Sequence, residues 1–263
     1  MFDQITPIIL TYNEAPNIGR TLEKLRWAKD IVVVDSFSTD ETLSIVKRFP
    51  QARIFQRRFD DFGGQRNFGM TEGGIKTEWI LMMDADYVLT DEFVEEVKRL
   101  NPIPEIVGYK TRFIYCIYGH PLRGTVYPPL VSLFRKDCGR YVADGHTQNL
   151  IIEGEIEDLK APILHDDHKS LARWLISQDH YARLEAVKLI QTDAEQLNIV
   201  DRFRRRIFLA PFAMFLYCLF GSGLILDGLF GWFYTFQRVF AEVAISLYLL
   251  QYDLKKLIPK IES

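Results

Sequence analysis

Residues 79–86, WILMMDAD, form an unbroken apolar run that ends in Asp84 and Asp86. A short hydrophobic run without polar alternation is typical of a strand buried inside a parallel sheet. Ligands of parallel sheets gather at the carboxyl ends of the strands, so both carboxylates are expected at a cleft. Mg²⁺ and Mn²⁺ bind through one or two carboxylates together with substrate phosphates. The stretch therefore predicts a divalent-metal site, with an ordinary aspartate turn as the alternative.

Strand and helix signals alternate through the first hundred residues. Apolar runs predict strands at residues 5–10, 30–35, 52–56 and 78–83. Helical connections are predicted at residues 17–28, 38–49, 64–75 and 90–100, and Ser38 with Glu41 has the spacing of a capping box. Strands that alternate with helices pair in parallel through right-handed crossovers. The sequence therefore predicts an α/β fold with a Rossmann-like sheet.

The second half of the chain has a different texture. Strand-like pieces at 109–118, 130–135 and 150–157 predict an extension that makes the sheet mixed. A long amphipathic helix is predicted over residues 170–197.

The last third of the chain is apolar. Four arginines between Arg202 and Arg206 precede residues 207–226, which contain no charge, and a second apolar segment covers 228–250. Twenty uncharged residues beside arginines predict a membrane-associated segment with a cytoplasmic flank, either spanning or interfacial. A buried hairpin of core helices is the alternative.

Composition limits the remaining choices. The 263 residues fit one large domain with an appendage, and the formal charge of -3 argues against a nucleic-acid-binding domain. Three scattered cysteines, Cys116, Cys138 and Cys218, fit a reducing compartment. No basic region opens the chain, so no secretory signal is expected and the first part should lie in the cytoplasm.

Polar motifs recur where the predicted strands of the first half end or begin. TYNE (11–14) follows the first strand, DSFSTD (35–40) follows the second, GQRN (64–67) precedes the fourth and DAD (84–86) follows it. Over residues 5–86 this ordered set resembles the family 2 glycosyltransferases of GT-A fold. Beyond residue 100 the chain is most similar to the lipopolysaccharide-core type of these enzymes.

The resemblance implies a set of nucleotide-sugar-binding residues: Thr11, Tyr12, Glu14, Asp35, Ser38, Arg66 and Asp84. Asp35 would accept a hydrogen bond from a uracil-like base, and a carboxylate at a strand's carboxyl end is also well placed for this on general grounds. Arg66 would pair with diphosphate oxygens. The alternatives are loop and cap roles for Asp35 and Asp40, and a surface salt bridge for Arg66.

The resemblance also implies a metal-dependent inverting transfer. Asp86 would bind the divalent metal, Mn²⁺ or Mg²⁺, while Asp84 holds the ribose or metal-bound water. His165 is a further candidate near the metal or diphosphate, with a satisfied core histidine or a surface residue as the alternatives. The base is expected in residues 141–148, where relatives tend to carry a His-Glu pair. Because His146 is followed here by threonine, Asp144 is the first candidate and His146 the second.

Together these inferences predict a glycosyltransferase that moves a sugar from a nucleotide sugar, expected to be a UDP-sugar, to a surface glycan or lipid-linked saccharide. Residues 1–200 would form the catalytic domain, with a nucleotide-sugar half (1–107) and an acceptor half (108–200). Residues 201–263 would hold it at the cytoplasmic face of the cell membrane.

Two alternative functions stay open. Residues 84–88, DADYV, also satisfy the first motif of the haloacid-dehalogenase phosphohydrolases, and Asp166 with Asp167 imitates their later acidic motif. Three strand signals precede DADYV, however, whereas that family places the motif after its first strand. The second alternative is an inactive membrane scaffold that only binds a nucleotide sugar, which the missing glutamate after His146 favours.

Overall fold

The computed structural model describes the backbone of residues 1–144 and 147–261 and the side chains of residues 1–142 and 148–256. The chain divides into two units. The sheet unit comprises residues 1–121, 127–143 and 147–169, and the helical unit comprises the remainder. Long helix α5 (Leu171–Gln191) therefore belongs to the C-terminal unit, whereas the sequence predicted a boundary between residues 200 and 201.

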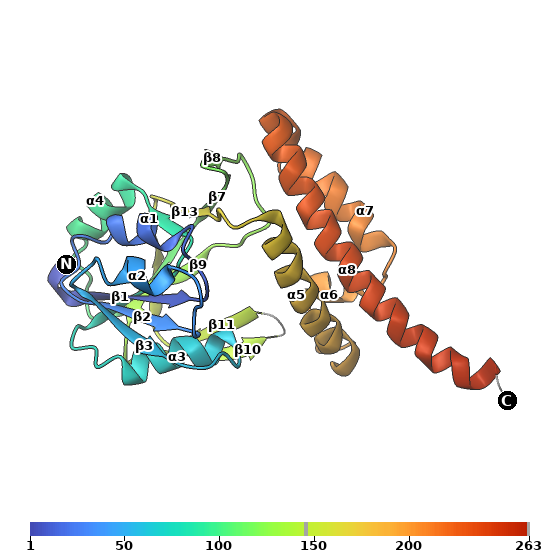
Figure 1. Cartoon of the computed structure of the whole chain (residues 1–263), viewed down its shortest axis with the longest axis horizontal. Coiled ribbons are helices and arrows are strands. Elements are labelled where there is room, and N and C mark those ends of the chain that lie inside the picture. Colours follow the sequence, from blue (N-terminus) through green and yellow to red (C-terminus); the bar gives the residue numbers. More distant parts are fainter. Residues whose placement is uncertain (145–146, 262–263) are drawn as a thin grey trace. The chain divides into compact units, whose positions relative to one another are not determined.

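Four parallel strands form the centre of the sheet unit (Figure 1). They are β1 (Ile5–Thr11), β2 (Ile31–Asp35), β3 (Ala52–Gln56) and β4 (Trp79–Asp84), in the order β3-β2-β1-β4. Three helices connect them: α1 (Ile18–Glu23), α2 (Thr42–Val46) and α3 (Phe62–Glu72). A short 3₁₀ turn, η1 (Phe2–Gln4), precedes the first strand. The predicted parallel Rossmann-like sheet is confirmed, because each predicted strand of the first half is present.

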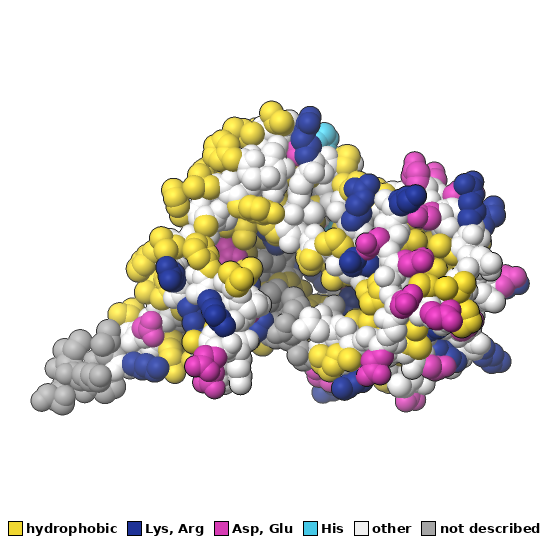
Figure 2. Space-filling view, turned by 180° about the vertical axis from the view of Figure 1, so that it is seen from behind, with side chains coloured by type: hydrophobic (Ala, Val, Ile, Leu, Met, Phe, Trp, Pro, Cys, Tyr) yellow, Lys and Arg dark blue, Asp and Glu magenta, His cyan; other side chains and the backbone are white. Residues whose placement is uncertain are grey.

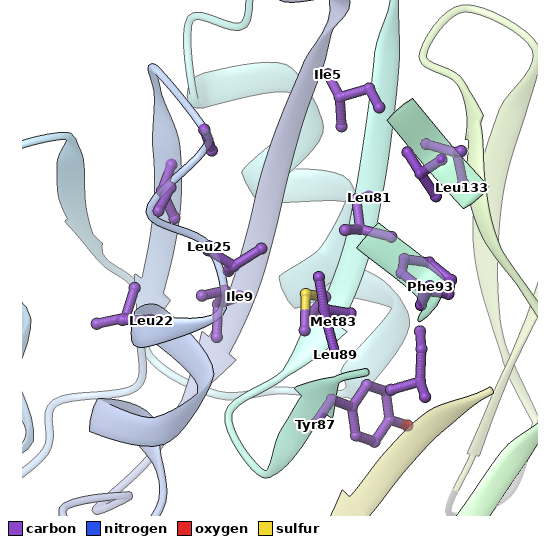
Figure 3. Packing of buried hydrophobic residues seen from close by; sticks show 14 of the residues in the cluster. Ile5, Ile9, Leu22, Leu25, Leu81, Met83, Tyr87, Leu89, Phe93 and Leu133 are labelled. Carbon is purple, nitrogen blue, oxygen red and sulfur yellow. The ribbon is translucent and has the colours of Figure 1, made fainter. Parts of the chain in front are cut away.

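Both faces of the parallel sheet are covered, which explains why its strands read as unbroken apolar runs. On one face, Ile9, Val33 and Leu81 pack with buried residues of α1, α2 and α4 (Asp91–Arg99). Figure 3 shows this packing around Met83 and Phe93. On the other face, the strands pack against α3 and a hairpin of β10 (Gly139–Asp144) and β11 (Thr147–Ile152).

Three further strands complete the main sheet and make it mixed, as predicted. Strand β9 (Leu130–Arg135) is antiparallel to β4 and to β6 (Ile106–Thr111), and β12 (Glu155–Asp158) runs parallel to β6. Helix α4 begins at Thr90, whose hydroxyl accepts a hydrogen bond from the backbone N–H of Phe93, as the sequence predicted.

A second sheet of four strands lies beside the end of β4. Its order is β5 (Tyr87–Leu89), β13 (Ile163–Asp166), β7 (Phe113–Ile117) and β8 (His120–Pro121). Strand β5 follows the DAD motif directly and pairs antiparallel with β13, so that His165 stands opposite Tyr87. This pairing joins residues 84–86 to the segment around residue 165.

The predicted capping box at Ser38 and Glu41 is wrong. Helix α2 begins at Thr42, and the side chain of its N-cap residue, Glu41, makes no capping hydrogen bond. The hydroxyl of Ser38 instead accepts a hydrogen bond from the backbone N–H of Asn13 at 2.7 Å. Ser38 also donates to Asp35. A contact between two loops thus outcompetes the local cap.

The helical unit consists of α5 with α6 (Ile199–Arg204), α7 (Leu209–Leu216), a π turn η2 (Tyr217–Gly221), a 3₁₀ turn η3 (Leu224–Asp227) and the long α8 (Gly228–Ile261). Helices α5 and α8 pack through Ala182, Ala186, Leu189, Ile245 and Leu249. Gly223 and Gly228, both with positive φ, flank η3 and mark the turn between α7 and α8.

The arginines before the apolar segment do not form a simple charged flank. Arg204 bonds Glu242 and also lies within salt-bridge distance of Glu185 and Asp201, all three carboxylates being buried. Arg205 donates to backbone carbonyls at the end of α5. These two arginines therefore hold the helices of the unit together, a role that the sequence did not indicate.

Within the described residues, no single helix is both long and apolar enough to cross a membrane. Leu209–Gly221 and Leu224–Lys256 meet that criterion only as a pair, and the pair is bent by 70°.

Candidate functional site

The first three strand-end residues stand side by side in the register of the sheet. Thr11 of β1 is paired with Asp35 of β2, and Leu10 of β1 is paired with Asp84 of β4. Because the three strands are parallel, their carboxyl ends lie at one edge, where α/β sheets bind ligands. The structure therefore brings Thr11, Asp35 and Asp84 together, as the sequence predicted.

Asp35 is fully buried and holds two loops in place. Its carboxylate accepts hydrogen bonds from the Thr11 hydroxyl at 3.0 Å, the Ser38 backbone N–H at 3.0 Å and the Gln56 amide at 3.2 Å, and also from the Ser38 hydroxyl. A carboxylate has about four acceptor sites. A nucleobase that bonded Asp35 would therefore have to displace one of these donors.

The loops after β1 and β2 are joined by further bonds. Asn13 has a left-handed backbone with φ of 55°, and its side-chain oxygen accepts from the backbone N–H of Thr39 at 2.6 Å. Asp40 accepts from the backbone N–H of Ala15 and of Thr42. Asp40 thus has the loop role that was its alternative in the sequence. These bonds give the strand-end edge a fixed shape before any ligand binds.

Arg66 points from α3 to the end of β4. The residue is only 4% exposed, and its guanidinium donates to Asp84 at 2.7 Å and lies 5.4 Å from the ring centroid of Tyr141. Its Nε is buried and has no hydrogen-bond partner among the described residues. A surface salt bridge, the alternative reading of Arg66, is thereby excluded.

The neighbouring Asn67 has a structural task. Its side chain accepts from the backbone N–H of Tyr141 at 2.9 Å and donates to the backbone carbonyl of the same residue at 2.8 Å. Asn67 therefore bonds strand β10 to α3 and holds Tyr141 beside Arg66. Gly69, two positions later, allows α3 to approach the sheet, because a Cβ there would lie 2.8 Å from Ile8.

Asp86 and His165 meet beyond the end of β4. His165 Nε2 lies 3.4 Å from Asp86 Oδ2, and three tyrosine rings surround the imidazole, with centroids 4.7 to 5.2 Å away: Tyr87, Tyr115 and Tyr127. Burial by itself would lower the pKa of His165, but the Asp86 carboxylate reverses this and the net shift is upward. His165 thus lies at the predicted site.

Lys169 is the residue of this site that the sequence did not indicate. Its ammonium lies 2.7 Å from Glu14 Oε1, 3.4 Å from Asp167 Oδ2 and 3.9 Å from Asp86 Oδ2. Burial raises the pKa of Glu14 and would lower that of Lys169, but the surrounding carboxylates raise the pKa of Lys169 overall. Lys169 is therefore a fixed positive charge among three carboxylates.

Helix α1 anchors the segment that carries Lys169. Asn17 is fully buried and bonds Glu14, Asp167 and the backbone N–H of His168. Arg20 pairs with the Asp166 side chain and donates to its carbonyl oxygen at 2.7 Å. Sequence reasoning missed both α1 residues, since no local pattern reveals contacts to a segment about 150 positions away.

A divalent cation fits the residues around Asp86. Asp86 Oδ1 and His165 Nδ1 are buried and have no hydrogen-bond partner within the described part of the chain. No group of three or more His, Cys, Asp or Glu side chains suitable for a metal occurs among the described residues. Mg²⁺ and Mn²⁺ do not need one, because substrate phosphates and water supply the remaining oxygens. Asp86, with His165 beside it, would hold such an ion.

The other predicted residues are not part of this cluster or lie outside the description. Tyr12 is 54% exposed. Asp144 ends strand β10, but its side chain is outside the described residues, and so is all of His146. In the helical unit, Arg123 pairs with Asp227 at 3.0 Å. The proton acceptor of the predicted reaction is therefore not assigned by geometry.

The comparisons with known proteins concern the same region. Residues 6–103 match the model of glycosyl transferase family 2. The lipopolysaccharide core biosynthesis glycosyltransferase LpsC of Rhizobium meliloti is 27% identical over 237 residues, which cover 86% of this chain and 84% of that protein. An uncharacterized glycosyltransferase of Rickettsia felis is 33% identical over 99 residues, 37% of this chain and 34% of that protein.

Among solved structures, S. aureus TarS in complex with UDP-GlcNAc has a TM-score of 0.46 to this chain at 14% identity, over 96% of this chain and 92% of that one. The family match spans β1 to α4, the part that carries Thr11, Asp35, Arg66, Asp84 and Asp86.

Proposed function

This chain belongs to the family 2 glycosyltransferases, and we propose that it transfers a sugar, with inversion, from a UDP-sugar to a hydroxyl of a surface glycan or lipid-linked saccharide. The observation that carries the proposal is the buried Asp86 Oδ1, which has no hydrogen-bond partner among the residues that the structure describes and lies beside the strand ends that hold Asp35 and Asp84. The name of the relative LpsC supports a lipopolysaccharide-like acceptor.

The proposed reaction forms one bond and breaks one. The acceptor oxygen attacks the anomeric carbon as the bond from that carbon to the diphosphate oxygen breaks, and the acceptor proton passes to a base. A divalent cation, when bound, would stabilise the charge that grows on the leaving diphosphate. The buried guanidinium of Arg66 would stabilise the same negative charge. The ion pair with Asp84 holds this guanidinium in a fixed orientation.

The remaining groups have positioning roles in this proposal. Thr11 and Ser38 keep Asp35 oriented toward the nucleoside, and Lys169 keeps Glu14 near Asp86. Asp144 is proposed as the base, with His146 second. The site would act at the cytoplasmic face of the cell membrane, with the helical unit as the membrane-associated part.

A donor screen tests the function. The protein is incubated with Mn²⁺ and each common nucleotide sugar, and release of nucleoside diphosphate is measured with and without a lipopolysaccharide or lipid-linked acceptor. Release from a UDP-sugar, increased by acceptor, is expected. Calorimetry that detects no binding of UDP in the presence of Mn²⁺ would contradict the proposal.

The alternative function, a phosphohydrolase, is tested by incubating the protein with phosphate esters. The Arg66 ion pair occupies the Asp84 carboxylate that would have to act as the nucleophile, so no phosphoaspartate is expected after incubation with phosphate esters. Nucleotide-sugar binding without transfer to any acceptor would instead support the inactive scaffold.

A further inference from the structure

The turn between α7 and α8 carries almost no charge. Between Arg206 and Arg238 the sequence has one ionisable acid or base of the Asp, Glu, Lys, Arg and His types, Asp227. The Asp227 side chain is 5% exposed and accepts from the Arg123 backbone N–H at 2.9 Å and from its Nε at 3.0 Å. We name residues 207–237 the apolar hairpin. Its only charged group is thus neutralised inside the unit.

The outer surface of the apolar hairpin is hydrophobic and exposed. Five large side chains have exposed fractions of 77%, 63%, 62%, 69% and 86%: Phe208, Phe212, Phe220, Leu226 and Leu229. Figure 2 shows hydrophobic side chains spread over the helical unit in the left half of the view. Exposed apolar area of this kind on a soluble surface marks an interaction site.

The exposed side chains are not needed to form the hydrophobic interior of the hairpin. The hairpin has its own interior, in which Cys218, Leu219, Leu224 and Tyr234 are at most 1% exposed. The Tyr234 hydroxyl accepts from the Val126 backbone N–H at 3.1 Å, which ties the hairpin to residues 122–126 of the same unit. The hairpin is therefore preformed, and its outer apolar side chains are surplus to its packing.

The distribution of the exposed side chains favours lipid over a protein partner. They extend from Phe208, just before α7, through the turn to Leu229 in the first turn of α8. Protein interfaces carry a polar rim and about one hydrogen bond per 100–200 Å². The outer surface of the hairpin has no charged group to supply such a rim, whereas exposed Arg206 at its start can meet an anionic headgroup.

The dimensions of the hairpin argue for insertion without crossing. Helix α7 and the π turn have 8 and 5 residues, and at 1.5 Å per residue they are about 20 Å long, short of a hydrocarbon core of about 30 Å. The following helical segment, Leu224–Lys256, then departs from the direction of Leu209–Gly221 by 70°. Farther along α8, Tyr248 bonds the exposed Asp179 of α5, a pair that belongs in water.

We infer that the apolar hairpin inserts into one leaflet of an anionic phospholipid bilayer and anchors the protein there without spanning it. This goes beyond the membrane location proposed above, because it names the inserted surface and its depth. It depends on the helical unit alone, so its failure would leave the transfer reaction standing.

Vesicle binding tests the anchor. The full chain is sedimented with vesicles of phosphatidylglycerol and phosphatidylethanolamine, and the variant Phe208→Ser/Phe212→Ser/Leu229→Ser is compared with the matched control Ile176→Ser/Ile199→Ser, which alters exposed residues outside the hairpin. We expect the hairpin variant to bind about 100-fold more weakly and the control to bind like the parent. Donor hydrolysis in solution should be unchanged in both, which separates this test from that of the proposed function.

Depth is measured with a fluorescent label on Phe220→Cys in a Cys138→Ser background. Quenching should be stronger by a nitroxide near the headgroup than by one at the bilayer centre, and a quencher confined to the vesicle lumen should have no effect. Equal vesicle binding by both variants would overturn the anchor. So would a dimer in solution that only the hairpin substitutions dissociate, and quenching from the lumen would overturn insertion in one leaflet.

Discussion

The ammonium of Lys169 lies 2.7 Å from Glu14 Oε1, although the two residues are 155 positions apart. This ion pair joins the last residues of the sheet unit to the loop after its first strand. Asp167 and Asp86 are the other carboxylates near the same ammonium. Lys169 therefore holds the three carboxylates of the site together, and its replacement should affect these carboxylates most directly.

Lys169→Met should lower the free energy of unfolding by about 2–4 kcal/mol, because it leaves buried carboxylates without their cation. Denaturant titration measures the change. Lys24→Met, which removes an exposed pair with Asp91, is the control and should cost less than about 1 kcal/mol.

Lys169→Met should also bind Mn²⁺ more tightly in calorimetry, since the Lys169 ammonium no longer repels the ion. Weaker Mn²⁺ binding would contradict this account.

Asp86→Asn should reduce kcat/KM by about 10²–10³-fold or more, because it removes the ionised carboxylate that faces the metal and diphosphate. Activity is measured as nucleoside diphosphate release, and circular dichroism should show an intact fold. Asp91→Asn, at the exposed start of α4, should keep parental activity. Full activity of the Asp86 variant would remove this residue from the metal role.

Arg66→Lys should raise the KM for the donor about 10-fold, since an ammonium retains the charge but loses the planar fork that binds Asp84 and phosphate together. Steady-state kinetics with varied UDP-sugar measures the effect. Arg57→Lys, which alters a guanidinium paired with the exposed Asp60, should change KM little. An unchanged KM in the Arg66 variant would show that the guanidinium does not contact the donor.

Asn67→Ala should lower the free energy of unfolding by about 2–3 kcal/mol, because both backbone groups of Tyr141 lose their partner. Asn67→Asp keeps the acceptor and loses the donor, so its cost should be intermediate. Thr71→Ala, on an exposed position of the same helix, provides the comparison. The free energies of unfolding are measured by thermal and urea denaturation. Values equal to that of the parent for all three variants would refute the structural role of Asn67.

Removal of divalent cations with EDTA should abolish transfer, and added Mn²⁺ or Mg²⁺ should restore it, because a cation then binds Asp86 Oδ1, which has no hydrogen-bond partner in the described part of the chain. Monovalent salt at equal ionic strength is the control. Transfer that continues at its full rate in EDTA would mean that Lys169 and Arg66 alone neutralise the leaving diphosphate.

Sequence patterns predicted those parts of the protein that depend on neighbours along the chain. The apolar run 79–83 predicted a buried strand because both faces of β4 are covered, and Thr90 predicted the start of α4 because a cap is a local contact. The capping box at Ser38 failed for the opposite reason. Its hydroxyl found a better partner in Asn13, on a loop 25 residues away.

Periodicity and strand order along the chain were enough to predict the parallel sheet, the apolar segment after residue 206 and the strand-end positions of Thr11, Asp35, Asp84 and Asp86, because they define which residues share an edge. Only the tertiary structure decided that His165 meets Asp86, that Lys169 lies among three carboxylates, and that Arg204 turns inward to Glu242. Those contacts join segments tens of residues apart or more. Local sequence patterns do not predict these contacts. A buried charge is stable only when the folded chain places an oppositely charged partner beside it.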